Sequence, residues 1–366
     1  MRDDFPEDVP PDLAGATLTI DLDAVAENWR RLCRQLGKPC AGVVKADGYG
    51  LGLGPVARTL AAAGCDTFFV ALPEEGLRLR RILPHPEARI FVLTGAPEGA
   101  EGLFATHRLV PVLNTLEQAA RWLAAAPAGA PHALHVDTGM TRLGLPAEDI
   151  EALPGGLAPC LVMSHLACSD EPGHALNAAQ AAAFAAARAR FPQAEASLAN
   201  SSGVFLGASY AFDLGRPGIA LYGGNPTPGA PNPMRQVVTL QAKILQVRRV
   251  DTPRTVGYGA SARIEGGSLL ATVAAGYADG LHRALGNVGS GLLGDRVVPM
   301  VGRVSMDLIV FDVSAAPADL TRPGQSITLI GGRHDADALA AEAGTISYEI
   351  LTSLGHRYAR TYLGGA

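Results

Sequence analysis

The sequence predicts an α/β fold: a (β/α)8 TIM barrel followed by a second, β-rich C-terminal domain. Short apolar, β-rich runs alternate with helical stretches through the first 230 residues. Near-continuous apolar strands separated by helices are typical of a parallel sheet, and eight such units fit a closed barrel. A Pro- and Gly-rich stretch at residues 225–233 then indicates a domain boundary, and the β-branched runs that follow it have little helix between them.

The eight expected strands of the barrel are short β-rich runs. They lie at residues 40–45, 66–72, 89–94, 109–113, 133–137, 158–165, 194–199 and 212–216. Clear helical stretches follow the first, second, fourth and sixth strands, at residues 55–64, 73–82, 115–126 and 175–190. The helical segments after the other four strands are weaker, near 147–152 after the fifth and near 202–207 after the seventh. We expect the barrel to cover residues 12–232.

The second domain is expected to cover residues 233–366. Its β-branched runs lie at residues 237–250, 269–275, 296–313 and 325–330. Two helical stretches near 335–355 are expected to close it, and residues 357–363 can return as a strand. The first 15 or so residues of the chain can pair with either domain.

Composition excludes several classes of protein. Of the 366 residues 48% are hydrophobic and 18% charged, which is enough apolar material for a full core and excludes a disordered chain. The net charge of −5, without a basic face, argues against a nucleic-acid partner. Five cysteines without a C-x-x-C pair indicate neither a disulfide framework nor a metal site. With no signal peptide or bilayer-length apolar run, we expect a cytoplasmic protein that contacts no membrane.

Lysine is scarce in this chain. Of the 30 basic residues, 27 are Arg and only Lys38, Lys45 and Lys243 are Lys. Arg stays protonated, whereas a desolvated Lys can lose its proton and attack a carbonyl carbon. Lys45 ends the first expected barrel strand, and the active sites of barrels gather at the carboxyl ends of their strands. We therefore favour a chemical role for Lys45 over the alternative of a surface lysine.

Other expected strands also end in polar residues. These residues are His135, Asp137 and Arg142 after the fifth strand, Ser164 and His165 after the sixth, Asn200 and Ser201 after the seventh, and Arg216 at the eighth. Ser201 and the amides of Gly218 and Ile219 follow the last two strands, where barrels often bind phosphate. A lysine able to form a Schiff base beside a phosphate site suggests pyridoxal 5'-phosphate as the cofactor.

Six ordered motifs resemble the bacterial alanine racemase family. They lie at residues 43–50, 137–144, 200–201, 216–223, 276–280 and 302–307. The resemblance runs from about residue 17 to the C-terminus. It implies a pyridoxal-phosphate-dependent isomerase that interconverts L-alanine and D-alanine and supplies D-alanine for peptidoglycan. It also implies a homodimer, in which the barrel of one subunit and the β-rich domain of the other build each active site.

The resemblance implies catalytic roles for four residues. Lys45 matches the Schiff-base lysine, which is also the base on one face of the substrate. Tyr277 matches the opposing base, which comes from the other subunit. Arg216 matches the residue at the pyridine nitrogen, and His165 matches the histidine that links this arginine to the tyrosine. Because a free Tyr has a pKa of about 10, Tyr277 needs a nearby positive charge to act as a phenolate.

The resemblance also implies binding roles. The positions that match phosphate-binding residues are Tyr49, Ser201, Gly218, Ile219 and Tyr348. Arg142 matches a residue near the cofactor's phenolic oxygen and the substrate carboxylate, and Met306 and Asp307 match a loop on the substrate side. One position departs from the family: His135 stands where many members carry a carbamylated lysine that holds the equivalent of Arg142. An imidazole cannot form a carbamate, so we expect an enzyme that does not depend on bicarbonate.

Three alternatives remain beside an alanine racemase. The first is a racemase of serine or of broader specificity. Its substrates differ from alanine by a methylene or a hydroxyl, and such a group changes the binding free energy in a pocket by only about 1–3 kcal/mol. A related barrel-type amino-acid decarboxylase normally has an acidic residue at the pyridine nitrogen and a Cys near the substrate loop, where this chain has Arg216 and Ser305. A non-catalytic pyridoxal-phosphate carrier resembles the barrel alone. The sequence does not distinguish a biosynthetic from a catabolic role.

Overall fold

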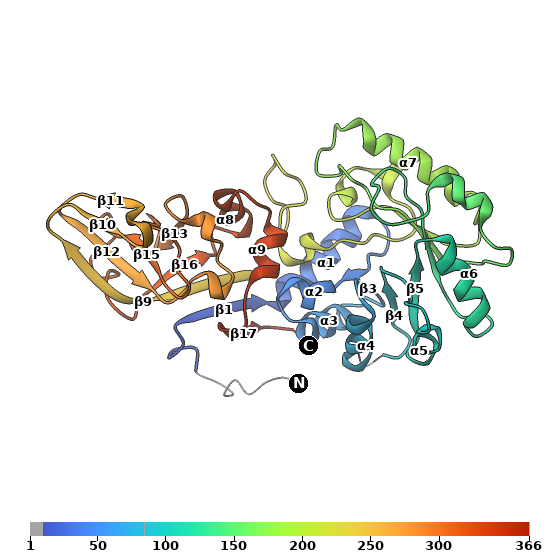
Figure 1. Ribbon diagram of the computed structural model, residues 1–366, viewed down its shortest axis with the longest axis horizontal. Helices are drawn as coiled ribbons and strands as arrows, with labels where there is room; N and C mark the ends of the chain where they lie inside the picture. Colours follow the sequence, from blue (N-terminus) through green and yellow to red (C-terminus); the bar gives the residue numbers. More distant parts are fainter. Residues whose placement is uncertain (1–9, 84, 366) are drawn as a thin grey trace. The chain divides into compact units, whose positions relative to one another are not determined.

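The computed structural model describes residues 10–83 and 85–365. The chain divides into two compact units. One unit contains the N-terminal residues up to Leu22 together with Gln236–Gly364, and the other contains Asp23–Arg235 with Gly365. We call them the C-terminal unit and the barrel unit and describe each by itself; Figure 1 labels their elements.

The barrel unit is built on a parallel sheet whose strands follow one another in chain order. Its strands are β2 (Gly42–Val43), β3 (Thr67–Val70), β4 (Arg89–Val92), β5 (Leu109–Leu113), β6 (Ala133–His135), β7 (Leu161–Met163) and β8 (Glu195–Ser197). Nearly every residue of these strands is buried. Burial on both faces is expected for a parallel sheet with helices outside it. The predicted α/β barrel class is confirmed.

The eighth expected strand is wrong as a strand, although its residues lie in the right place. The backbone of Gly215 exchanges hydrogen bonds with the segment before β2, accepting from Ala41 at 2.8 Å and donating to Pro39 at 2.9 Å. On its other side Arg216 donates to Ala199 at 2.8 Å. These residues therefore bridge β8 and β2. Pro217 has no amide hydrogen to donate, so no regular ladder forms there.

Helices cover the sheet of the barrel unit. They are α1 (Leu22–Leu36), α2 (Lys45–Tyr49), α3 (Leu53–Ala62), α4 (Pro73–Ile82), α5 (Glu101–Thr106), α6 (Leu116–Ala125) and α7 (Ala175–Arg188). Short 3-10 helices lie at η1 (Ala147–Ala152), η2 (Gly203–Phe205), η3 (Ala208–Tyr210) and η4 (Ile219–Tyr222). In Figure 1, α3 to α6 lie beside β3, β4 and β5. The sequence predictions omit α1, although Val25, Leu32 and Leu36 recur at helical spacing and are buried.

The C-terminal unit is a largely antiparallel sheet organised around one long strand, β9 (Val238–Val250). The other strands of this sheet are β1 (Ala16–Asp21), β12 (Ser268–Val273), β13 (Ser290–Leu293), β14 (Arg296–Pro299), β15 (Ile309–Asp312), β16 (Ser326–Ile330) and β17 (Ala359–Leu363). β10 (Arg254–Val256) and β11 (Ala262–Ile264) form a separate hairpin. The unit also contains η5 (Tyr258–Ala260), η6 (Tyr277–Asp279), η7 (Arg283–Leu285), α8 (Ala336–Ala343) and α9 (Ser347–Ser353).

Two details of the C-terminal unit differ from the expected ranges. Residues 12–22, grouped with the barrel from the sequence, lie in this unit, where β1 pairs antiparallel with β9 and parallel with β17. Alternate residues of β1 are buried, a pattern that suits a sheet with one covered face rather than a barrel strand. The run at 296–313 is also not one strand, because the loop between β14 and β15 carries one of the six motifs.

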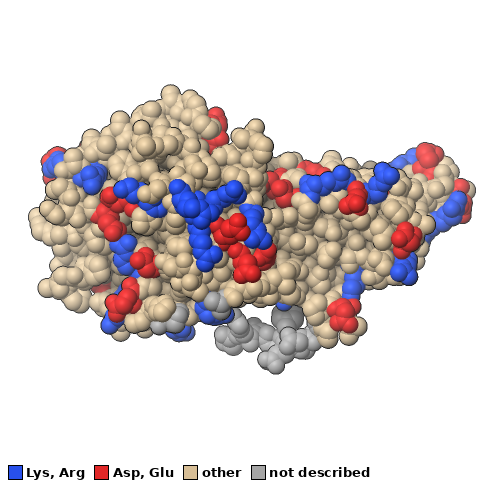
Figure 2. All heavy atoms as spheres, turned by 180° about the vertical axis from the view of Figure 1, so that it is seen from behind, with Lys and Arg blue, Asp and Glu red and all other residues tan. Residues whose placement is uncertain are grey.

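Three further observations concern the whole described chain. Among these residues, no helix is both long and apolar enough to cross a bilayer. All five cysteines are free thiols. On the face shown in Figure 2, basic and acidic side chains lie interspersed rather than in separate fields.

Candidate active site

Lys45 lies directly beyond the carboxyl end of β2, after the buried pair Val43 and Val44. Its side chain is half-buried. Burial lowers the pKa of the Lys45 ammonium, the positive charge of Arg142 lowers it further, and the carboxylate of Glu75 opposes both. A larger share of Lys45 is therefore the neutral amine at neutral pH than for an exposed lysine. This is the form that attacks a carbonyl or removes a proton.

The backbone after Lys45 forms a left-handed turn. Ala46, Asp47 and Tyr49 have φ values of 53°, 54° and 55°, and Gly48 between them has 65°. Left-handed backbone costs an L-residue roughly 1–2 kcal/mol, so a four-residue turn with three non-glycine members needs support from its surroundings. The turn brings Tyr49 into the core, where its ring stacks on Tyr222 with 4.6 Å between centroids.

Tyr49, Ser201 and Gly218 come together beside this turn. The hydroxyl of Ser201 accepts the amide hydrogens of Gly218 at 2.9 Å and Ala220 at 3.3 Å. A Cβ on Gly218 would lie 2.0 Å from the Tyr49 hydroxyl oxygen, so only glycine fits there. In the described chain no group accepts the amide hydrogen of Ile219, the first residue of η4. Hydroxyls and a spare amide are the donors that a phosphate group requires.

Arg216 is a buried cation whose hydrogen-bond partners among the described residues are neutral groups. It is 4% exposed, and it donates from Nη1 to the Ser197 hydroxyl and from Nη2 to the Ser164 carbonyl, both at 2.5 Å. Nη2 also lies 3.5 Å from His165 Nδ1. No carboxylate of the described residues forms an ion pair with it. Burial lowers the pKa of Arg216 to about 9. A buried charge of this kind indicates that a ligand atom completes the site.

His165 is held neutral beside Arg216. Burial and the positive charge of Arg216 lower the pKa of His165 well below its ordinary value. The imidazole therefore carries one ring proton at neutral pH, and its Nδ1 faces the guanidinium, so its proton lies on Nε2. His165 can thus accept from Arg216 and donate on its far side.

His135 does not serve as a partner for Arg142. Its Nδ1 donates to the Asn114 side-chain oxygen at 2.9 Å, because the Asn114 amide nitrogen is already bonded to the carbonyls of Leu93 and Val112. Burial and Arg216 lower the pKa of His135 to about 4, so it is neutral at physiological pH. The nearby Asp137 carboxylate accepts from the backbone amides of residues 139–141. Arg142 is exposed and has no ion-pair partner in the described part of the chain.

The C-terminal unit brings Tyr277, Met306 and Asp307 together. The amide of Tyr277 donates to the Ser305 carbonyl at 2.9 Å, and that of Ala278 to the Met306 carbonyl at 3.0 Å. Arg357 bridges the two loops through ion pairs with Asp279 at 3.0 Å and Asp307 at 2.7 Å. Tyr277 and Met306 remain 41% and 53% exposed, so this pair of loops presents both side chains outward.

The predicted site residues therefore form two groups. Lys45, Tyr49, Arg142, His165, Ser201, Arg216, Gly218 and Ile219 belong to the barrel unit, and Tyr277, Met306, Asp307 and Tyr348 belong to the C-terminal unit. Tyr348 lies at the start of α9 and is 40% exposed. The sequence predictions missed Asn114, Ser197 and Tyr222, which hold site residues in place. Asn114 directly follows β5, so its position at a strand end was the available signal.

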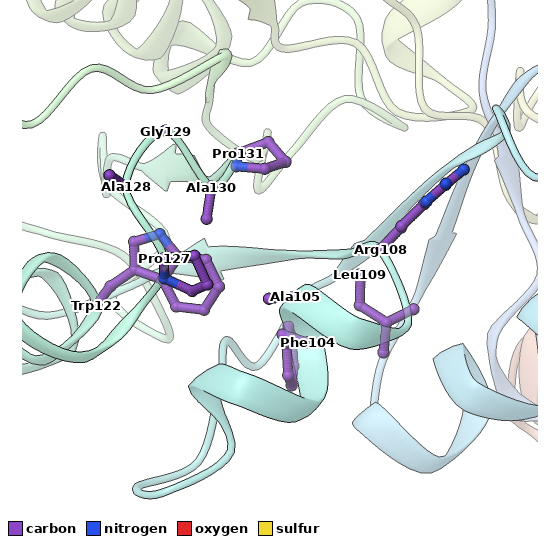
Figure 3. Close-up of a pocket in the computed structure, with 10 residues that line it drawn as sticks. All are labelled: Phe104, Ala105, Arg108, Leu109, Trp122, Pro127, Ala128, Gly129, Ala130 and Pro131. Atoms are coloured by element: carbon purple, nitrogen blue, oxygen red, sulfur yellow. The ribbon is translucent and has the colours of Figure 1, made fainter.

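A cavity of about 400 Å³ lies elsewhere on the barrel unit, between α5, α6 and the loop at residues 127–131. Figure 3 shows Phe104, Ala105, Trp122 and the loop around it, with the Arg108 side chain pointing away from them. Leu109 begins β5, so this cavity lies toward the amino ends of the strands. Barrel enzymes react at the opposite ends, so we assign it no part in the site.

Comparisons with known proteins match both units of the chain. A family model described as "Alanine racemase, N-terminal domain" matches residues 20–226, and one described as "Alanine racemase, C-terminal domain" matches residues 237–362. An alanine racemase of Rhodospirillum rubrum is 59% identical over 96% of this chain and 97% of its own length. One of Acidiphilium cryptum is 52% identical over 94% of this chain and 98% of its own length.

A solved structure is also similar along nearly the whole chain. It is the alanine racemase of Bartonella henselae with covalently bound pyridoxal phosphate, which superposes with a TM-score of 0.90 at 38% identity. The match covers 96% of this chain and all of that one. The structural match therefore spans both units, not the barrel unit alone.

Proposed function

This chain belongs to the alanine racemase family, and we propose that Lys45 and Tyr277 are the two bases of its reaction. The enzyme is an isomerase that interconverts L-alanine and D-alanine. Racemisation removes the α-proton from one face of the carbon and returns a proton to the other face. A base on each face achieves this without turning the substrate over. The lowered pKa of Lys45 and the exposed phenol of Tyr277 support these roles.

The cofactor that we propose is pyridoxal 5'-phosphate, held by Lys45. Bound pyridoxal phosphate is an electron sink that makes the α-proton of an amino acid removable. Tyr49, Ser201, Gly218, Ile219 and Tyr348 are the residues that we assign to its phosphate. The donors around Ser201 and the spare amide of Ile219 suit this group. Arg216 supplies the buried positive charge that would meet the pyridine nitrogen, which a guanidinium cannot protonate.

Arg216 and His165 have a second proposed task, which is to stabilise the phenolate of Tyr277. An unperturbed tyrosine has a pKa of about 10, so a base at neutral pH needs a positive charge close by. The neutral His165 accepts from the buried Arg216, and its second ring nitrogen, which bonds to no described residue, can donate to an anion. A chain of charge-assisted hydrogen bonds then spreads the arginine charge toward the phenolate.

The substrate carboxylate is assigned to Arg142, with Met306 and Asp307 on the other side of the substrate. Arg142 is the exposed guanidinium whose charge acts on Lys45, His135 and His165, so it stands close to all three. We further propose a homodimer in which the barrel unit of one subunit and the C-terminal unit of the other form each site. D-alanine from this reaction would serve peptidoglycan synthesis.

One observation supports this function above the others: a half-buried lysine lies at the same barrel end as a buried arginine that forms no ion pair with the described residues. The test is racemisation of a panel of L-amino acids by the purified enzyme with pyridoxal phosphate, in deuterium oxide. We expect D-alanine carrying one α-deuteron, and kcat/KM for L-alanine about 10- to 100-fold above that for L-serine. Chiral chromatography with mass spectrometry measures both results.

The same panel distinguishes the alternatives. Equal rates with serine and larger amino acids would indicate a broad racemase. Release of carbon dioxide from lysine or ornithine would identify a decarboxylase. Cofactor binding without any turnover of the panel would indicate a carrier and contradict the proposed function.

The environment of His135 predicts that racemase activity does not depend on bicarbonate. The neutral imidazole is bonded to Asn114 and cannot be carbamylated, so position 135 offers Arg142 no carbamate. Enzyme assayed in buffer free of carbon dioxide should therefore have the same kcat as enzyme with added bicarbonate. A His135→Lys variant, which restores a lysine at this position, is the matched control. Bicarbonate dependence of the wild-type enzyme, or a carbamate on one of its lysines by intact mass, would contradict the prediction.

A further inference from the structure

The left-handed turn after Lys45 is held from outside by helix α4. Two side chains of α4 contact it, Glu75 and Arg78, which lie three residues apart and so share one face of the helix. Neither residue belongs to the site described above. Their contacts place a charged pair against the backbone that carries the proposed cofactor lysine.

Glu75 divides its carboxylate between the helix and the turn. Oε2 accepts the amide hydrogens of Ala71 at 2.8 Å and Leu72 at 3.2 Å, which caps the start of α4. Oε1 accepts the amide hydrogen of Ala46 at 2.6 Å. The cap needs only Oε2, so the bond to Ala46 is not explained by the helix. Ala46 is the first left-handed residue and the immediate neighbour of Lys45.

Arg78 supports the same turn one residue further along. Its Nη1 forms an ion pair with Asp47 Oδ1 at 3.1 Å, and the same carboxylate oxygen accepts the amide hydrogen of Leu53 at 3.1 Å. This pair is partly exposed, so it contributes little to stability by itself. Its effect is geometric: α4 and α3 both hold Asp47 in its left-handed conformation.

Two charged groups act on the Lys45 amine. Arg142 repels its positive charge, and Glu75 attracts it. A carboxylate that is fixed on Ala46 therefore stands where it counteracts Arg142. Its loss would change both the direction of the lysine side chain and the charge near it.

We propose that Glu75 is a positioning residue for Lys45: its carboxylate holds the left-handed turn and keeps one negative charge beside the amine. This inference rests on the proposed function of Lys45. Glu75 touches neither substrate nor cofactor and acts only through the turn.

The experiment compares Glu75→Gln with Glu74→Gln in the full-length enzyme. Both variants remove one charge from the first turn of α4, but no contact of the described residues involves the exposed Glu74 side chain. Lysine labelled with ¹³C at Cε gives one signal for each of the three lysines, so the pH titration of Lys45 can be followed directly before cofactor is added. Lys38→Arg and Lys243→Arg variants assign the signals.

For Glu75→Gln we expect the pKa of Lys45 to fall, because the negative charge that attracts its ammonium group is lost. We also expect kcat of the cofactor-loaded enzyme to fall about 10- to 100-fold, since a misplaced catalytic group costs rate even when binding is unchanged. KM for alanine should stay near the wild-type value. Glu74→Gln should leave all three quantities unchanged. Glu75→Asp keeps the charge, so its Lys45 titration should lie nearer to the wild type.

The proposal would be overturned if Glu75→Gln kept the wild-type titration of Lys45 and the wild-type kcat. Glu75 would then be only a helix cap, even if its loss lowered the melting temperature. If Glu75→Gln does not fold, Glu75→Asp carries the test: its shorter side chain should lower kcat while the titration stays close to wild type. Unchanged kcat in that variant would equally overturn it. Racemase activity retained by Lys45→Ala would instead contradict the proposed function. The titration of Lys45 in the Glu75→Gln variant would still report whether Glu75 acts on Lys45.

Discussion

Replacing Lys45 by alanine is expected to abolish covalent cofactor binding and to lower kcat by at least about 10⁴-fold, the scale measured when a catalytic nucleophile is removed. Arg cannot replace it chemically, and the other two lysines lie outside the site: Lys38 is exposed and Lys243 bonds to the backbone carbonyl of Asp12. Wild-type enzyme with pyridoxal phosphate should absorb visible light. Borohydride reduction followed by peptide mapping should find the cofactor on Lys45 alone.

Lys38→Ala and Lys243→Ala are the matched controls, and both should keep the visible absorbance and the activity. A label on Lys38 or Lys243 in the wild type would contradict the assignment of Lys45. So would a Lys45→Ala enzyme that still racemises alanine. Absence of a chromophore in the wild type after addition of cofactor would reject pyridoxal phosphate itself.

Mixing Lys45→Ala and Tyr277→Ala homodimers should restore activity that neither has alone. The two residues belong to different compact units of the chain, and we propose that each site takes one unit from each subunit. In a mixed dimer one site then has both defects and the other has none. With random exchange in a twofold dimer about half of the dimers are mixed, so about a quarter of all sites regain wild-type activity. Activity after verified subunit exchange measures this fraction.

The control for this experiment is a mixture of Lys45→Ala with Arg216→Ala. Both residues belong to the barrel unit, so every site of that mixed dimer keeps one defect and no activity returns. If the Lys45 and Tyr277 variants also give no recovery after verified exchange, both bases of a site come from one chain. The shared site would then be rejected, and the two-base mechanism would remain to be tested within one subunit.

Much of the barrel was predictable because its signals are local. Most strands from β2 to β7 are short, largely apolar runs, and the side chains of such runs are buried wherever the fold places them. Lys45 could be recognised for the same reason: a rare lysine directly after an apolar strand is visible without knowledge of its neighbours. The alanine racemase family, inferred from six motifs, is confirmed by the matches over both units.

The remaining features of the fold and the site depend on contacts between residues that lie far apart in the sequence. β1 joins the C-terminal unit because its backbone pairs with β9, which lies more than 200 residues later in the chain. Residues 212–216 bridge β8 and β2 through single hydrogen bonds and form no regular strand. His135 is neutral because it is buried and lies near the positive charge of Arg216, and Glu75 bonds to Ala46, which lies 29 residues before it in the chain. The sequence by itself determined the family and predicted which residues carry the chemistry. Only the tertiary structure decided which of these side chains are charged and which neighbours hold them in place, because burial and hydrogen-bond partners are properties of the packed chain.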